Sequence, residues 1–157
     1  MSNKIVVQIS NSKNKFKSQK MNYWLVKSEP FKYSWSKFEE DKITFWDGVR
    51  NYQARNNLRE MTKGDLVLFY HSNEDKAVIG IAKVVKEFYQ DPTTEDKNWV
   101  VVDLQAVSKL KNPVTLSAIK NDSQLAEIGL VKQGRLSVMK LKNNDFDRIL
   151  FLSEGEK

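Results

Sequence analysis

Residues 45–56 bring together the side chains of this sequence that are best suited to binding a flat, polar ligand. Trp46 offers an aromatic face, and Arg50 and Asn51 add a cation and an amide shortly after it. We expect Asn51 to cap the helix that follows, which places Arg50 beside helix N-terminal N–H groups that favour an anion. A stacking face beside such donors suits a phosphate-linked nucleobase. The competing interpretation is a buried tryptophan followed by an ordinary turn and helix cap.

Three further polar runs stand where strands are expected to end. They are Lys27-Ser28, Tyr70-His71 and Arg135-Leu136-Ser137. The ends of several strands can bring side chains together at one mouth of a barrel or curled sheet. Taken separately, each run favours a purely structural role, and their convergence is a hypothesis for the structure to test.

Composition removes several kinds of chemistry. The sequence has no cysteine and one histidine, so disulfides, thiolate metal sites and multi-histidine metal sites are excluded. We find no glycine-rich phosphate loop and no nucleophile elbow. His71 could act as a base with Asp47 or Asp103, or it could be a hydrogen-bonded structural histidine. We therefore predict no metal and no cofactor.

The net charge of +6 is concentrated at the start of the chain. Residues 1–20 hold five lysines and no acidic residue, and their polar, aperiodic sequence predicts a disordered basic extension ahead of a native start at Met21. The remainder is nearly neutral, so any attraction to phosphate must be local. No apolar run is long enough to span a membrane, and we expect an intracellular protein, nuclear if it is eukaryotic.

The elements that must position these residues occur in a mixed order. Strands are expected at 23–26, 43–45, 66–70, 77–88, 99–107 and 135–139, and helices at 35–40, 52–61, 116–120, 123–128 and 145–152. Gly80 inside the longest apolar strand suggests a bend. This order predicts a small α+β domain around a curled sheet rather than alternating βαβ units.

Four separated motifs resemble the EVE domain family. They are residues 23–30, 46–56, 64–73 and 135–138, in the family's order, and the resemblance covers residues 21–152, leaving 153–157 as a tail. It implies a PUA-like curled β-barrel of about five to six strands with short flanking helices, related to YTH and ASCH domains. It also implies a non-catalytic reader of a modified base in DNA or RNA.

The resemblance also assigns roles within a base-binding pocket. Lys27 and Ser28 would lie at its floor or rim, and Trp46 would stack on the base. Asn51 and Tyr70 would fix the edge of the base. Second-rank candidates for phosphate or pocket-wall contacts are Arg50, His71, Arg135 and Ser137.

Two other functions remain open from the sequence. One is a hydrolase or transferase that uses His71 with a nearby acid. The other is a small-molecule or protein-interaction module whose pocket never meets nucleic acid. The expected partner is nucleic acid carrying a modified base, the protein is expected to be a monomer, and no protein partner is predicted.

Overall fold

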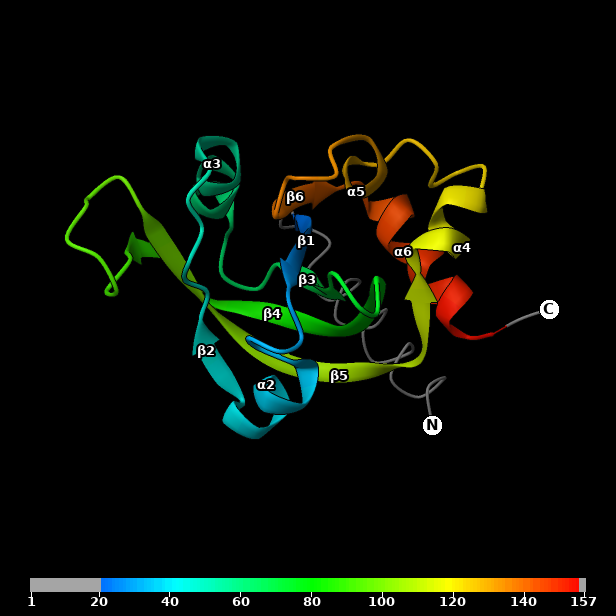
Figure 1. The fold of residues 1–157 in the computed structure, drawn as a ribbon, viewed down its shortest axis with the longest axis horizontal. Coiled ribbons are helices and arrows are strands. Elements are labelled where there is room, and N and C mark those ends of the chain that lie inside the picture. The colour runs from blue at the N-terminus through cyan, green and yellow to red at the C-terminus, as the bar shows by residue number, and fades with distance from the viewer. Residues whose placement is uncertain (1–20, 156–157) are drawn as a thin grey trace.

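The computed structural model describes residues 21–155, in which a six-stranded curled sheet is surrounded by five helices (Figure 1). The strands are β1 (Tyr23–Ser28), β2 (Ile43–Phe45), β3 (Leu66–His71), β4 (Ala77–Gln90), β5 (Val100–Thr115) and β6 (Val138–Leu141). The helices are α2 (Trp35–Asp41), α3 (Tyr52–Glu60), α4 (Leu116–Asn121), α5 (Gly129–Lys132) and α6 (Asn143–Ser153). The predicted extension over residues 1–20 lies outside the described residues.

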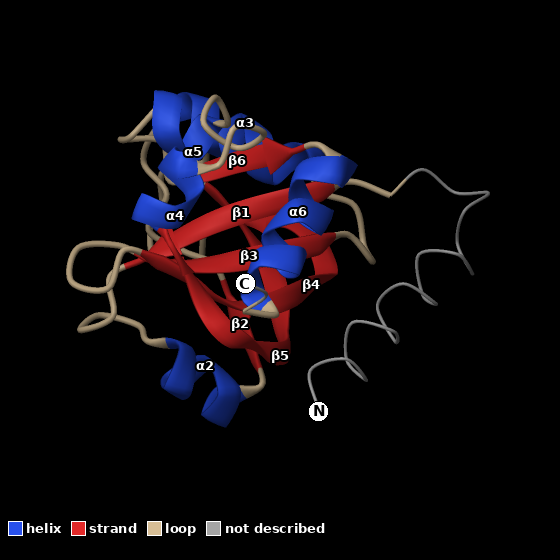
Figure 2. Ribbon diagram, turned by 90° about the vertical axis from the view of Figure 1, so that its right-hand side faces the viewer, coloured by secondary structure: helices blue, strands red, loops and turns tan. Residues whose placement is uncertain are grey.

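The sheet runs in the order β2-β5-β4-β3-β1-β6. β1 and β3 are parallel, whereas the other neighbouring strands are antiparallel. β2 and β6 are the two edges, so the sheet of the described residues curls without closing (Figure 2). The prediction of an α+β fold on a curled, PUA-like sheet with short flanking helices is confirmed, with the barrel left open between its edges.

The curl depends on the two long strands β4 and β5. Their pairing shifts register at four places, one of them between Val78 and Gly80, and each such irregularity increases local twist. A Cβ atom added at Gly80 would lie 2.6 Å from the ring of Trp35. Gly80 is therefore both part of a bulge, as its position suggested, and the point where a buried indole packs directly on the backbone.

A cluster of aromatic side chains fills the space between the sheet and α2. Trp35, Phe38 and Phe69 pack with ring centroids 5.3–5.5 Å apart, and Trp46 joins them through Phe69 at 5.6 Å. All four side chains are buried. Aromatic pairs at these spacings contribute specific geometry as well as buried area, so this cluster fixes the position of Trp46.

The helix cap expected at Asn51 is present, and α2 has a cap of the same kind at Ser34. Ser34 Oγ accepts from Lys37 N at 3.1 Å at the start of α2, and Asn51 Oδ1 accepts from Ala54 N at 2.9 Å at the start of α3. Each cap pairs one of the N–H groups that a helix start leaves unbonded. Asn51 thus sets where α3 begins, four residues after Asp47.

Two expectations about residues 99–129 are wrong. The strand expected at 99–107 continues to Thr115, because its polar second half pairs with the start of β4. The helix expected at 123–128 is a series of turns, and α5 begins only at Gly129. The Asp122 carboxylate accepts from the N–H groups of Gln124 and Leu125, which holds that segment as a turn.

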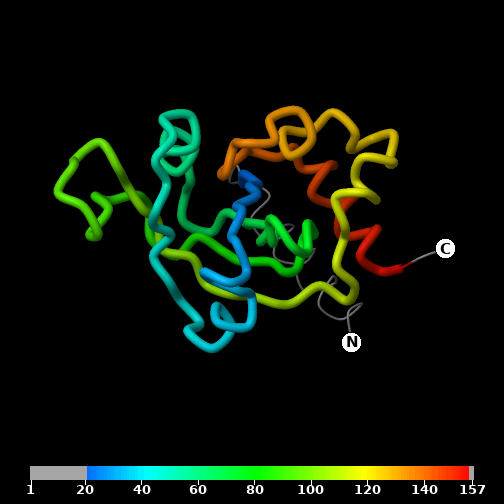
Figure 3. Tube along the Cα trace, viewed as in Figure 1, coloured from blue at the N-terminus to red at the C-terminus, as the bar shows by residue number. Residues whose placement is uncertain are grey.

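Two segments of the chain, one before α2 and one after it, meet in the same region. The chain leaves β1 at Ser28, turns through residues 29–34 into α2, and returns through β2 toward α3 (Figure 3). The segment before α2 and the segment after β2 both line the pocket described next.

Candidate functional site

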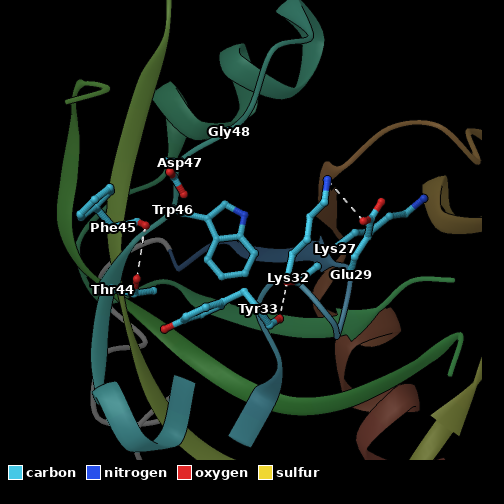
Figure 4. A pocket seen from close by; sticks show the side chains of 10 residues that line it. Lys27, Glu29, Lys32, Tyr33, Thr44, Phe45, Trp46, Asp47 and Gly48 are labelled. Carbon is cyan, nitrogen blue, oxygen red and sulfur yellow. Dashed lines mark hydrogen bonds and ion pairs between the residues drawn. The ribbon is translucent and has the colours of Figure 1, made fainter. Parts of the chain in front are cut away.

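A pocket of about 430 Å³ opens between the two segments that flank α2 and β2 (Figure 4). Its volume falls within the range of small-ligand sites, roughly 300–1,000 Å³. It is lined by Lys27, Ser28, Glu29, Lys32, Tyr33, Thr44, Phe45, Trp46, Asp47 and Gly48. Aromatic rings, two lysines and two carboxylates therefore meet around one opening.

Trp46 lines the pocket, but most of its surface is covered. The residue is 7% exposed, and its indole meets Phe69 edge-on at 5.6 Å and Tyr33 edge-on at 6.2 Å. Its backbone N–H donates to Val102 O at 2.8 Å, which extends the pairing of β2 with β5 by one residue. The structure thus lies between the two interpretations of the sequence, because Trp46 is a core residue that presents only a small part of its surface to the pocket.

Lys27 is a half-buried cation held in place at the pocket. Its Nζ donates to Gly134 O at 2.7 Å, and its backbone N–H donates to Ser137 O at 3.0 Å. Burial lowers the pKa of the Lys27 ammonium. The loop before β6, which carries the exposed Arg135, therefore lies beside Lys27 although the two are far apart in sequence. Ser137 enters these contacts through its carbonyl.

The turn after β1 completes the wall on the side of α2. Ser28 Oγ donates to Tyr33 O at 2.5 Å, and Tyr33 Oη donates to Asp41 Oδ2 at 2.9 Å. Burial is the main cause that raises the pKa of Tyr33, to about 12, so this phenol keeps its proton at neutral pH. The exposed Lys32 Nζ lies 3.5 Å from Oε1 of the partly buried Glu29 at the rim (Figure 4).

Tyr33 and Lys32 did not stand out in the sequence as ligand-binding residues. Pro30 indicates only that β1 ends and a turn begins, and the turn carries no periodic pattern that would orient its side chains. These residues could have been found only from their position, because the turn directly follows the strand end that carries Lys27 and Ser28.

Six of the nine expected site residues do not line this pocket: Arg135 and Ser137, described above, and four others. Asn51 caps α3, and Arg50 Nη1 bonds the buried carboxylate of Asp91 at 2.9 Å. Tyr70 is 3% exposed and pairs in register with Lys27 across β1 and β3. Its burial raises the pKa of its hydroxyl. His71, the fourth, is also enclosed.

His71 has both ring nitrogens engaged. Nε2 accepts the backbone N–H of Trp35 at 3.1 Å, so the ring proton resides on Nδ1, which faces Asp75 Oδ2 at 2.7 Å. The carboxylate beside His71 therefore belongs to Asp75, and neither Asp47 nor Asp103 bonds it among the described residues. The residue is 8% exposed, and the arrangement matches the structural role considered for it.

Two properties of residues 21–155 bear on the class of site. No group of three or more His, Cys, Asp or Glu side chains there could hold a metal ion. No helix in that part of the chain has the length and apolar character needed to cross a membrane.

The family follows from comparison with known proteins. Residues 22–152 match the family model described as the EVE domain. The chain belongs to the EVE domain family. This EVE domain is 37% identical over 169 residues to thymocyte nuclear protein 1 of Mus musculus, covering 86% of this chain and 75% of the mouse protein.

Solved structures agree with this EVE domain in fold. The human THYN1 protein in complex with 5-methylcytosine-containing DNA superimposes with a TM-score of 0.81 at 34% identity, covering 87% of this chain and 99% of that one. An ASCH protein from Zymomonas mobilis gives a TM-score of 0.53 at 12% identity, covering 83% and 94%, which shows a shared fold only. The expected relation to the EVE and ASCH folds is confirmed.

Proposed function

We propose that this EVE domain reads a modified base in DNA, and that the base enters the pocket beside Trp46 without undergoing a reaction. The pocket itself carries the proposal, because it combines aromatic walls with the cations Lys27 and Lys32. The relative solved with 5-methylcytosine-containing DNA supports this choice of ligand. The same pocket could accept a base from RNA, and the test below includes both polymers.

A small energy difference would be enough for such a reader to discriminate. Extruding a base from a duplex costs a few kcal/mol, and stacking on an aromatic side chain returns about 1–3 kcal/mol. Burying one additional methyl group contributes about 0.8 kcal/mol, which corresponds to about fourfold in affinity. Because Trp46 offers only a small part of its surface, Tyr33 and Phe45 would supply the remaining apolar wall.

The geometry around His71 does not favour an enzyme. A general base must reach the proton that it abstracts, whereas this ring is enclosed and its two nitrogens face Trp35 and Asp75. A non-catalytic role therefore forms part of the proposal. A pocket for a small molecule or a peptide is an outcome that the binding experiment can reveal.

The test compares oligonucleotides that differ only in one methyl group. Fluorescence anisotropy would measure the affinity of the wild type for duplex and single strands of DNA and RNA with cytosine or 5-methylcytosine. We expect tighter binding of the methylated DNA by about fourfold or more. Trp46→Ala should remove that preference. Equal affinity of the wild type for methylated and unmethylated strands would refute the proposal for this base.

A second variant separates loss of binding from loss of fold. Trp46 packs on Phe69, so its replacement can destabilise the core. Lys32 is 70% exposed in its side chain and lines the rim, so Lys32→Glu should weaken DNA binding without lowering the melting temperature. Lys120→Glu, on α4, exchanges another exposed lysine that does not line this pocket, and it should change affinity less.

A further inference from the structure

A second aromatic cluster lies on the surface at the start of α3. The rings of Tyr52 and Trp99 stack with centroids 5.0 Å apart and planes 30° apart. The guanidinium carbon of Arg55 lies 5.0 Å from the Tyr52 centroid, and that of Arg50 lies 5.7 Å from the Trp99 centroid. Tyr52 is 56% exposed, so a large aromatic surface remains in water.

The charge of this cluster resides mainly on Arg55. Its Nε and Nη2 donate to Asn56 Oδ1 at 3.1 and 2.7 Å, and its Nη1 donates to Asn98 O at 3.1 Å. Both acceptors are neutral, and among residues 21–155 no carboxylate forms an ion pair with this guanidinium. Arg50, by contrast, is neutralised by Asp91. The side chain of Arg55 is thus held in place with its positive charge available to an anion.

The cluster lies close to the pocket along the chain. Gly48 lines the pocket, and Tyr52 follows four residues later, so their Cα atoms are at most about 14 Å apart. The Gly48 N–H also faces the Asp91 carboxylate that binds Arg50, at 3.5 Å. A strand rises about 3.4 Å per nucleotide in B-DNA, so the cluster lies within about four nucleotides of a base held in the pocket.

We propose that Tyr52, Trp99 and Arg55 bind the nucleotides that flank the base in the pocket. A neighbouring base stacks on the exposed aromatic surface of Tyr52, and Arg55 binds a phosphate of the same strand. Exposed aromatic rings beside an arginine are the usual means of holding an unpaired strand, because every base has a stacking face and every link carries a negative charge. This inference rests on the proposed function, since it places a strand in continuation of the captured base.

The experiment measures how affinity grows with the length of the DNA. The probes are 5-methyl-deoxycytidine monophosphate and a single strand of about nine nucleotides with 5-methylcytosine at its centre, a length within the usual range of single-strand sites. The wild type should bind the longer probe more tightly. Tyr52→Ala should reduce affinity for the longer probe about tenfold and leave the mononucleotide unaffected, whereas Tyr52→Phe should keep the wild-type affinity.

The salt dependence tests the role of Arg55 separately. Arg55→Gln should make the slope of log affinity against log salt concentration shallower by about 0.7 for a single strand, the effect of one lost phosphate contact. For Tyr52→Ala the matched control is Phe151→Ala, because Phe151 is 51% exposed and has Arg148 5.1 Å from its ring. Phe151 belongs to α6, at the opposite end of the molecule from α3 (Figure 1). This control should bind the longer strand as the wild type does.

The outcomes separate this inference from the proposed function. If Tyr52→Ala binds the longer strand as tightly as the wild type, or if flanking nucleotides add no affinity to the wild type, the surface does not bind the strand. If the wild type ignores methylation but Tyr52→Ala still loses the gain from length, the modified-base proposal fails and the strand-binding surface stands.

Discussion

Replacing Gly80 by alanine tests how tightly the core behind the pocket is packed. The new Cβ would lie 2.6 Å from one carbon of the Trp35 ring and 2.7 Å from two others. Ordinary contact begins at 3.4 Å, so the ring or the strand must move by about 1 Å. Trp35 is 2% exposed and meets Phe69 at 5.3 Å, which leaves the ring no open side. Overpacking of this kind costs about 1–3 kcal/mol of folding free energy.

Thermal unfolding followed by circular dichroism measures this cost. For a chain of this size, 1–3 kcal/mol lowers the melting temperature by about 2–12 °C. Gly134→Ala is the matched control, because an added Cβ there has no atom within 4 Å and the backbone is not in the left-handed region. If Gly80→Ala has the same melting temperature as the wild type, the contact with Trp35 is not tight. The argument for a rigid wall behind Trp46 would then fail.

Two further predictions concern Asp65 and Lys27. The buried Asp65 carboxylate accepts from Trp24 Nε1 at 2.9 Å and from two backbone N–H groups. Asp65→Ala should therefore lower the free energy of unfolding, measured in urea, by about 3 kcal/mol, and Asp65→Asn should lower it less. A decrease below about 1 kcal/mol for Asp65→Ala would contradict this role. The pKa of Lys27 is lowered from 10.5 by burial, so its folded form gives up its proton at a lower pH than the unfolded chain. As pH rises through this window, the free energy of unfolding should rise, because the unfolded state binds more protons, while DNA affinity should fall. The fall should be absent in Lys27→Met, and the same alkaline loss in that variant would assign it to another group.

The sequence correctly predicted those features of the fold that depend on interactions between residues close together in the chain. Asn51 and Ser34 begin helices because their side chains can reach an N–H group three residues on, a geometry that depends on a few neighbouring residues. Gly80 was correctly predicted to lie at a bend, because a glycine inside a strand affects the backbone locally. The second half of β5 was missed because its burial is intermittent and its pairing partner, the start of β4, lies about 35 residues away in sequence.

The pocket could be predicted only in part for a related reason. Trp46, Lys27 and Ser28 line it together, and each comes from a strand end or strand exit visible in the sequence. Tyr70 also lies at a strand end, yet it pairs in register with Lys27 and remains outside the lining. A strand end fixes where a residue is along the sheet, whereas its access to solvent depends on which loops cover it, which is a tertiary property.

The order of the pocket-lining residues along the chain has an evolutionary consequence. All of them fall between positions 27 and 48, although the sheet behind them is assembled from the whole domain. Under the proposed function, ligand preference would reside in this one short segment, and the sheet that supports it could diverge separately. Relatives could acquire new specificities by changing this short interval alone, and a chimera that swaps only this interval should inherit the preference of its donor.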